Sequence, residues 1–172
     1  MKIKINNYIL ESYVDGPGIR FSLFTQGCPH HCKGCHNPQT HDFDAGKEIE
    51  IQTIVDKMVA NPLLDGITLT GGEPFCQVNE CLELIKQLKK ANPNYDVITY
   101  TGFTIEELLK KGHTENPQIL EFLSYIDYLI DGPFVLELRD LDIDFRGSKN
   151  QRIIDAKKSV IENKAIETQF EM

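Results

Sequence analysis

The chain has 172 residues, which suits one domain, so we expect residues 1–172 to fold as a single unit. Hydrophobic residues make up 41% and charged residues 26% of the chain, which is ordinary for a globular protein and excludes a disordered or collagen-like one. The net charge of −8 argues against nucleic acid as the main partner. The start, MKIKINNYIL, lacks the apolar core of a secretion signal, and no run approaches the ~18 apolar residues of a membrane span. We therefore expect a cytoplasmic protein with no membrane partner.

Four short apolar runs predict β-strands, and each of them ends in glycine. Runs that are apolar on both faces are typical of a parallel sheet covered by helices. The runs, in chain order, are FSLFTQG (21–27), GITLTGG (66–72), DVITYTG (96–102) and IDYLIDG (126–132).

Helical patterns lie between these strands and predict a β/α series with right-handed crossovers. Thr104 followed by Glu107 predicts a capping box, and Gly112 is expected to end that helix. Pro117 suits the first turn of the next helix. The helical segments are expected within 50–62, 78–93, 104–112 and 116–125.

The glycines at the strand ends predict a shared site. Ligands of parallel α/β proteins bind at the carboxyl ends of the strands, and glycine lets backbone come close to a ligand. We therefore expect four segments to meet on one rim: the loop after residue 27, GGEP (71–74), TGF (101–103) and DGPF (131–134).

The first of these loops, GCPHHCKGCHNP (27–38), carries three cysteines spaced C-x3-C-x2-C. A structural zinc site would need a fourth ligand, which one of four nearby histidines could supply: His30, His31, His36 or His41. A 4Fe–4S cluster held by three thiolates would instead leave one iron open to a small molecule. Of the remaining cysteines, Cys81 falls on an apolar helix stripe and is expected in the core, and Cys76 is expected near the rim without a ligand role.

The three-cysteine loop after the first predicted strand, with GGEP at the end of the next, resembles the radical S-adenosylmethionine enzymes. DGPGIR (15–20) and the cysteine loop narrow the resemblance to the activases of glycyl-radical enzymes. DGPF (131–134) and RGSKNQR (146–152) are most similar to the activases of anaerobic ribonucleotide reductases. The resemblance extends from about residue 8 to residue 156.

This resemblance implies an α/β fold, a single radical S-adenosylmethionine domain over 1–172, built as an incomplete (β/α) barrel with an open mouth. It implies an oxidoreductase that works anaerobically, cleaves S-adenosylmethionine reductively at a 4Fe–4S cluster and generates a glycyl radical on its partner. That partner would be an anaerobic ribonucleoside-triphosphate reductase. The electron would come from an external donor such as flavodoxin or ferredoxin.

The resemblance also assigns site residues. Cys28, Cys32 and Cys35 would be the catalytic and metal-binding residues, each holding one iron. The backbone of Gly71, Gly72 and Glu73 would bind the methionyl ammonium, because carbonyl groups accept its hydrogen bonds. Gly34, Cys35 and His36 would line the adenine pocket, with the ring of His36 in the place of an aromatic residue that many members of the family have before the third cysteine.

Other functions stay open at this point. The same chemistry could serve a pyruvate formate-lyase-type activase or a small-molecule radical enzyme such as a deazaguanine synthase. A zinc-binding module without catalysis is a third possibility. Asp15 and Arg20 lie on motif segments, and a basic cluster of Arg146, Lys149 and Arg152 is expected either to dock a partner, to hold a carboxylate or to lie in a solvated loop.

Overall fold

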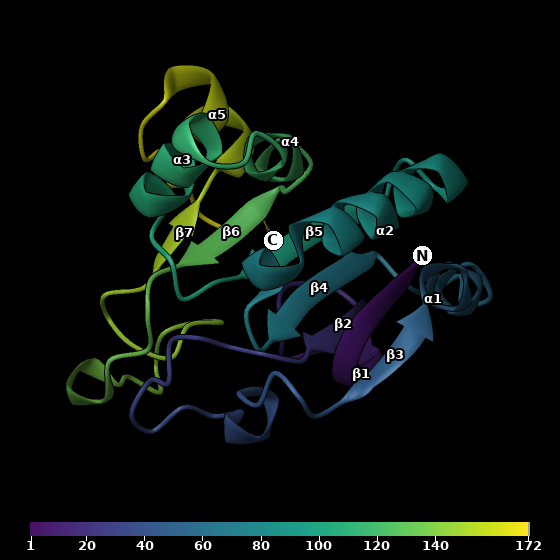
Figure 1. Ribbon diagram of the computed structural model, residues 1–172, viewed down its shortest axis with the longest axis horizontal. Coiled ribbons are helices and arrows are strands. Elements are labelled where there is room, and N and C mark those ends of the chain that lie inside the picture. The colour runs from purple at the N-terminus through teal and green to yellow at the C-terminus, as the bar shows by residue number, and fades with distance from the viewer. Residues whose placement is uncertain (172) are drawn as a thin grey trace.

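Four parallel strands form the centre of one seven-stranded sheet in the computed structural model, which describes residues 1–171 (Figure 1). The strand order is β3-β1-β2-β4-β5-β6-β7. The parallel strands follow one another in chain order, as expected when each right-handed connection carries a helix. They span Arg20–Thr25 (β2), Gly66–Gly71 (β4), Asp96–Tyr100 (β5) and Tyr128–Asp131 (β6).

All four strands predicted from the sequence are present, and the prediction of a parallel sheet is confirmed. The glycines that mark their ends are needed for backbone geometry. Gly27, Gly71 and Gly132 have φ angles of 104°, 89° and 95°, a region that glycine enters without steric cost. The chain therefore turns sharply at the carboxyl end of three of the four strands.

Three antiparallel strands extend the sheet and were not predicted from the sequence. Strands β3 and β7 have only four and three residues, which is too short for an alternating pattern to be recognised. In β1 the alternation of buried Ile3 and Ile5 stops at Asn6, where the strand also becomes irregular. The additional strands are Lys2–Ser12 (β1), Lys47–Glu50 (β3) and Arg152–Ile154 (β7).

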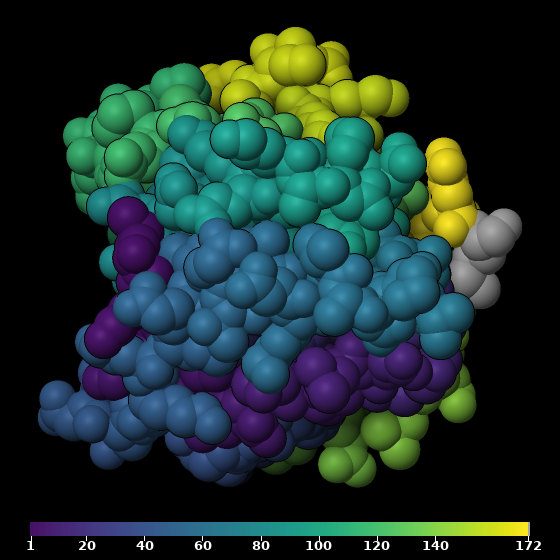
Figure 2. Space-filling model, turned by 90° about the vertical axis from the view of Figure 1, so that its right-hand side faces the viewer, coloured from purple at the N-terminus to yellow at the C-terminus, as the bar shows by residue number. Residues whose placement is uncertain are grey.

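The helices form one layer in which α1 contacts α2, α2 contacts α4, and α4 contacts α3 and α5. Figure 2 shows this order on one side of the molecule, where blue, teal and yellow segments follow one another upward. The α-helices span Ile51–Val59 (α1), Val78–Ala91 (α2), Ile105–Thr114 (α3), Gln118–Ser124 (α4) and Ala156–Glu162 (α5). Short 3-10 turns span Pro38–Thr40 (η1), Pro74–Gln77 (η2) and Leu136–Leu138 (η3).

The start of α3 agrees with the sequence prediction, whereas its end does not. The capping box is confirmed, because Glu107 N donates to Thr104 Oγ1 at 3.2 Å and Thr104 N donates to Glu107 Oε1 at 3.3 Å. The prediction that Gly112 ends this helix is wrong, since α3 continues to Thr114. A Cβ atom at Gly112 would lie 2.5 Å from Leu120 of α4, so this glycine permits the close approach of two helices.

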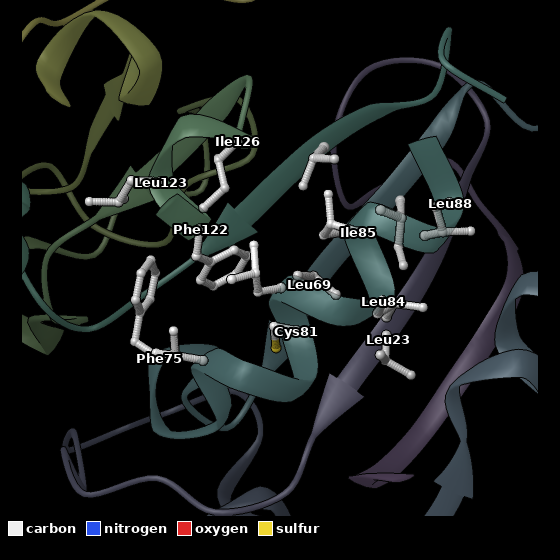
Figure 3. Packing of buried hydrophobic residues seen from close by; sticks show 14 of the residues in the cluster. Leu23, Leu69, Phe75, Cys81, Leu84, Ile85, Leu88, Phe122, Leu123 and Ile126 are labelled. Atoms are coloured by element: carbon white, nitrogen blue, oxygen red, sulfur yellow. The ribbon is translucent and has the colours of Figure 1, made fainter. Parts of the chain in front are cut away.

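The main core lies between the sheet and the helices (Figure 3). The rings of Phe75 and Phe122 pack with their centroids 4.9 Å apart. Cys81 of α2 is fully buried among these apolar side chains, as the sequence predicted. Burial of this thiol raises its pKa far above the ordinary value, so Cys81 is an inert core residue.

The opposite face of the central strands carries several buried polar side chains where the segment 13–19 lies against it. Arg20 is fully buried there and donates to Thr68 Oγ1 at 2.7 Å and to Ile67 O at 2.7 Å. Its guanidinium also pairs with the carboxylate of Asp96 at 2.6 Å. Asp15 accepts hydrogen bonds from the hydroxyl groups of Ser12 and Ser22 at 2.6 and 2.8 Å. The DGPGIR segment is therefore held onto the sheet by its own polar residues.

The fold is α/β, as predicted, with an open sheet whose edges are β3 and β7. Within residues 1–171, no helix is both long enough and apolar enough to cross a membrane.

Candidate active site

One cavity of about 110 Å³ lies where the parallel strands end, and it brings the four predicted rim segments together. The convergence predicted from the strand-end glycines is therefore confirmed. In Figure 1 the loops that follow β2 and β6 lie next to each other beyond the arrowheads of the central strands. The residues around the cavity include three thiols and four glycines: Cys28, His30, Cys32, Cys35, His41, Thr70, Gly71, Gly72, Tyr100, Thr101, Gly102, Gly132, Phe134 and Gln151.

The three cysteines of the loop differ in their surroundings. Cys28 is 8% exposed, and burial raises the pKa of its thiol, although backbone hydrogen bonds from His30 and His31 oppose that shift. Cys32 and Cys35 are partly exposed, and Cys35 Sγ accepts a hydrogen bond from Asn37 N at 3.4 Å. All five cysteines of the chain are free thiols, so none of the three is withdrawn into a disulfide.

The remaining cysteine near the rim, Cys76, is exposed and does not line the cavity. Partial desolvation of its thiol, with the nearby charge of Glu73, raises the pKa of Cys76 to about 11. Its thiol therefore stays protonated at neutral pH.

The thiols share a cavity without converging on a single point. Among residues 1–171, no group of three or more His, Cys, Asp or Glu side chains is close enough to hold one metal ion. A tetrahedral zinc site requires such convergence, whereas each thiolate of an iron–sulfur cluster binds a different iron. Three separate thiols around one cavity therefore fit a cluster better than a single ion.

Glycine backbone forms another part of the wall of this cavity. A Cβ atom at Gly72 would lie 2.5 Å from Gly27 O, and one at Gly102 would lie 2.4 Å from the ring of His30. Gly72 N donates to Thr25 O at 2.9 Å, and Glu73 N donates to Gly27 O at 2.8 Å. Because these N–H groups are already bonded, the segment has carbonyl groups and not donors to offer a ligand.

The side chain of Glu73 points into the protein and is fully buried. Its carboxylate accepts hydrogen bonds from Thr101 Oγ1 at 2.9 Å, from Gly102 N at 2.8 Å and from Phe75 N at 3.1 Å. His30 Nε2 lies 2.5 Å from the same carboxylate. The bond to Phe75 N is that of the N-cap of η2. The contacts to His30, Thr101 and Gly102 were not predicted.

A second cavity of about 380 Å³ adjoins the first and shares five residues with it: Cys35, Thr70, Tyr100, Phe134 and Gln151. His36 is exposed at this cavity, and its ring packs 5.1 Å from that of Phe134. Gly34 has φ 77° and lies against Leu136, where a Cβ atom would come within 2.9 Å. The structure thus places His36 and Cys35 beside space large enough for a small molecule, whereas Gly34 lines neither cavity.

Phe134 and Tyr100 were given no individual site role from the sequence, although both line the two cavities. Phe134 is the last residue of the predicted rim segment DGPF. Tyr100 is held by a hydrogen bond from its hydroxyl to Phe145 O at 2.6 Å. The motifs DGPF and RGSKNQR contain Phe134 and Gln151, and they are the sequence features from which these cavity-lining residues could have been predicted.

The basic cluster does not act as one surface. Arg152 is engaged in ion pairs with Asp131 at 2.6 Å and Glu106 at 2.5 Å. Arg146 lines the larger cavity, and its buried Nε has no hydrogen-bond partner within residues 1–171. Lys149 is exposed. The three cations therefore have three different environments, and only Arg146 faces the candidate site.

Comparison with known proteins agrees with this geometry. A family model described as a 4Fe-4S single cluster domain matches residues 14–154. The anaerobic ribonucleoside-triphosphate reductase-activating protein of Vibrio cholerae is 38% identical over 146 residues, which covers 81% of this chain and 90% of the relative. Proteins of the same name from Pasteurella multocida and Escherichia coli K12 are 38% and 34% identical, covering 85% of this chain and 93% and 94% of theirs.

Among solved structures, QueE from Escherichia coli is similar with a TM-score of 0.44 and 19% identity, over 60% of this chain and 54% of that one. The sequence relatives cover most of the chain, and the matched 4Fe-4S domain includes all three cysteines and all four strand-end segments. The chain therefore belongs to the family of anaerobic ribonucleoside-triphosphate reductase-activating proteins.

Proposed function

We propose that this protein activates an anaerobic ribonucleoside-triphosphate reductase by generating a glycyl radical on it. The observation that carries the proposal is the single cavity lined by three free thiols and by the backbone of four glycines. A second cavity next to it offers room for an organic ligand. This combination suits a cluster with an open iron and a small molecule bound beside it.

The residues present fit both groups. Cys28, Cys32 and Cys35 would hold three irons of a 4Fe–4S cluster. The backbone carbonyl groups of Gly71, Gly72 and Glu73 would accept hydrogen bonds from the methionyl ammonium of S-adenosylmethionine. When bound, the cluster and S-adenosylmethionine supply reductive cleavage of a sulfonium bond and, from it, abstraction of a hydrogen atom.

The chain itself would orient and shield these groups. Cys35 and His36 would line the adenine pocket on the side of the larger cavity, where His36 packs against Phe134, and the backbone of Gly34 would border the pocket next to Cys35. Phe134 lines both cavities and would limit the access of water to the smaller one. The buried Nε of Arg146 is a donor that a carboxylate in the larger cavity would satisfy.

The architecture suits a macromolecular substrate. We propose that the curved sheet is an incomplete (β/α) barrel whose open mouth lies at the carboxyl ends of β2, β4, β5 and β6. Residues 1–172 would act as a single radical S-adenosylmethionine domain in the cytoplasm. A flavodoxin or ferredoxin would deliver the electron, and the reductase would present its glycine at the mouth.

Electron paramagnetic resonance spectroscopy tests the proposal on anaerobically purified, iron-reconstituted protein. We expect a reduced 4Fe–4S signal that changes when S-adenosylmethionine is added, and then a glycyl radical signal when a cognate anaerobic reductase is present. A cluster that cleaves S-adenosylmethionine without activating that reductase would favour a different protein or small-molecule substrate. Zinc at one per chain with no iron uptake would contradict radical chemistry altogether.

A further inference from the structure

The cysteine loop has few bonds of its own to hold it in place. Cys28 N donates to His41 O at 3.2 Å at the start of the loop, and Cys35 N donates to Cys32 O at 3.1 Å near its end. No helix or strand is formed between residues 28 and 35. The position of the middle of the loop therefore depends on side-chain contacts with the rest of the protein.

His30 supplies such a contact. It lies midway between Cys28 and Cys32, and its side chain is 16% exposed. Its ring packs edge-on against Phe103 with centroids 4.6 Å apart and covers Gly102, where a Cβ atom would clash with it. Because the ring is confined on these sides, fixing it also fixes the backbone that carries both flanking cysteines.

The group that fixes the ring is the buried carboxylate of Glu73. A carboxylate removed from water must be matched by donors, and here they come from three parts of the chain. His30 Nε2 belongs to the cysteine loop, Gly102 N and Thr101 Oγ1 follow β5, and Phe75 N lies in η2. Glu73 therefore joins the cysteine loop to the ends of β4 and β5.

We propose that Glu73 is a positioning residue that acts through His30, and that this pair holds the cysteine loop in its cluster-binding conformation before any metal arrives. The inference rests on the proposed function for the identity of the metal group. It adds that the acidic side chain of the GGEP segment orients cysteine ligands, while the backbone of the same segment serves the organic ligand. Groups that orient ligands from outside a metal site typically change metal affinity or activity by about 10–100-fold when removed.

Hydrogen exchange on the cluster-free chain tests the positioning directly. We expect the amides of Cys28 and Cys35, which donate to His41 O and Cys32 O, to be protected in the wild-type protein and to exchange at the rate of an unstructured loop in His30→Ala and Glu73→Ala. The amides of β4 and β5 should keep their protection in His30→Ala, which shows that the fold is intact. Glu73→Gln keeps the shape of the side chain and an acceptor oxygen, so it should retain part of the protection.

His31→Asn is the matched control. His31 is the neighbouring imidazole, is exposed, and has φ 48°, a conformation that asparagine tolerates well. Its side chain makes no hydrogen bond to Glu73 within residues 1–171. We expect loop protection in this variant to match the wild type.

Cluster retention and spectra then connect the pair to the metal. After reconstitution, His30→Ala should lose its cluster to an iron chelator about 10–100-fold faster than the wild type and give a broadened electron paramagnetic resonance signal. Adding His30→Ala to Glu73→Ala should cause little further loss, because both changes break the same link.

The outcomes separate this inference from the proposed function. A wild-type protein that takes up no 4Fe–4S cluster overturns the proposed function and the cluster role of the pair with it. A wild-type protein that forms the cluster, with unchanged exchange, retention and spectra in His30→Ala, overturns only the positioning role.

Discussion

The α-carbon of Gly72 packs against the backbone of Gly27, so that a Cβ atom on Gly72 would lie 2.5 Å from the Gly27 carbonyl oxygen. Because the atoms in contact are backbone, neither side can move without shifting β4 or the start of the cysteine loop. We expect Gly72→Ala to destabilise the fold by about 1–3 kcal/mol and to weaken cluster retention. Urea unfolding and iron analysis of the reconstituted protein measure the two effects.

Gly132→Ala provides the comparison for that substitution. Unlike Gly72, Gly132 has a positive φ, of 95°, and its nearest neighbour would be 3.7 Å from an added Cβ atom. This variant carries backbone strain without the steric contact, so it should retain iron better than Gly72→Ala. Equal iron loss in both variants would contradict the role of close packing at Gly72.

The buried guanidinium of Arg20 is expected to contribute strongly to the stability of the fold, through its bonds on the sheet face against which the segment 13–19 lies. Arg20→Met would remove four side-chain hydrogen bonds and leave the Asp96 carboxylate without its partner. We expect a loss of about 3 kcal/mol, the lower end for breaking a buried ion pair, because the Asp96 side chain is 39% exposed. Urea unfolding measures this loss, and Asp96→Asn, which keeps an acceptor for Arg20, should cost less.

The ion pair of Glu106 with Arg152 predicts a small loss of stability in acid. Hydrogen bonding from Arg152 lowers the pKa of the Glu106 carboxyl below its ordinary value of 4.5. The stabilisation is thus complete above pH 4.5 and is lost as the pH falls through the lowered folded-state pKa. Glu106→Gln should make the free energy of unfolding less dependent on pH in this range. The effect should be small because the Glu106 side chain is 58% exposed. Glu48→Gln, on the surface of β3, controls for the change in net charge.

Substitution of single cysteines should divide them into two classes. We expect Cys28→Ala, Cys32→Ala and Cys35→Ala to lose the 4Fe–4S absorbance, whereas Cys76→Ala should keep about four irons per chain. The reason is location, since the first three thiols line the smaller cavity and Cys76 does not. Loss of iron in Cys76→Ala would mean that this thiol reaches the cluster.

The central sheet was predictable because its signals are local. Each parallel strand is a short apolar run that ends in glycine, and residues such as Thr104 and Glu107 cap a helix within a few positions. The edge strands β3 and β7 were not predicted, because so few residues cannot display a period. Gly112 was misjudged for a different reason: its neighbour Leu120 belongs to another helix, and that tertiary contact explains the glycine.

The candidate site, too, was predictable from the sequence only in part. The cysteine spacing and the glycine-ended strands located the rim, because the ends of parallel strands meet at one edge of a sheet. The partners of Glu73 could not be read from its own segment, since His30 lies 43 residues before it and Thr101 lies 28 after it. The pairing of Arg152 with Asp131, 21 residues away, likewise depends on the register of β6 with β7.

The order of these residues along the chain has a consequence for biogenesis. The cysteine loop is synthesised first, then Glu73, and last the groups after β5 that hold the Glu73 carboxylate. During translation the thiols leave the ribosome well before the residues that position them. Because β5 must pair with β4 before that carboxylate is fully bonded, we expect iron delivery to succeed only after residue 102 has emerged. A nascent chain stalled earlier would present three unrestrained thiols, open to oxidation or to the wrong metal.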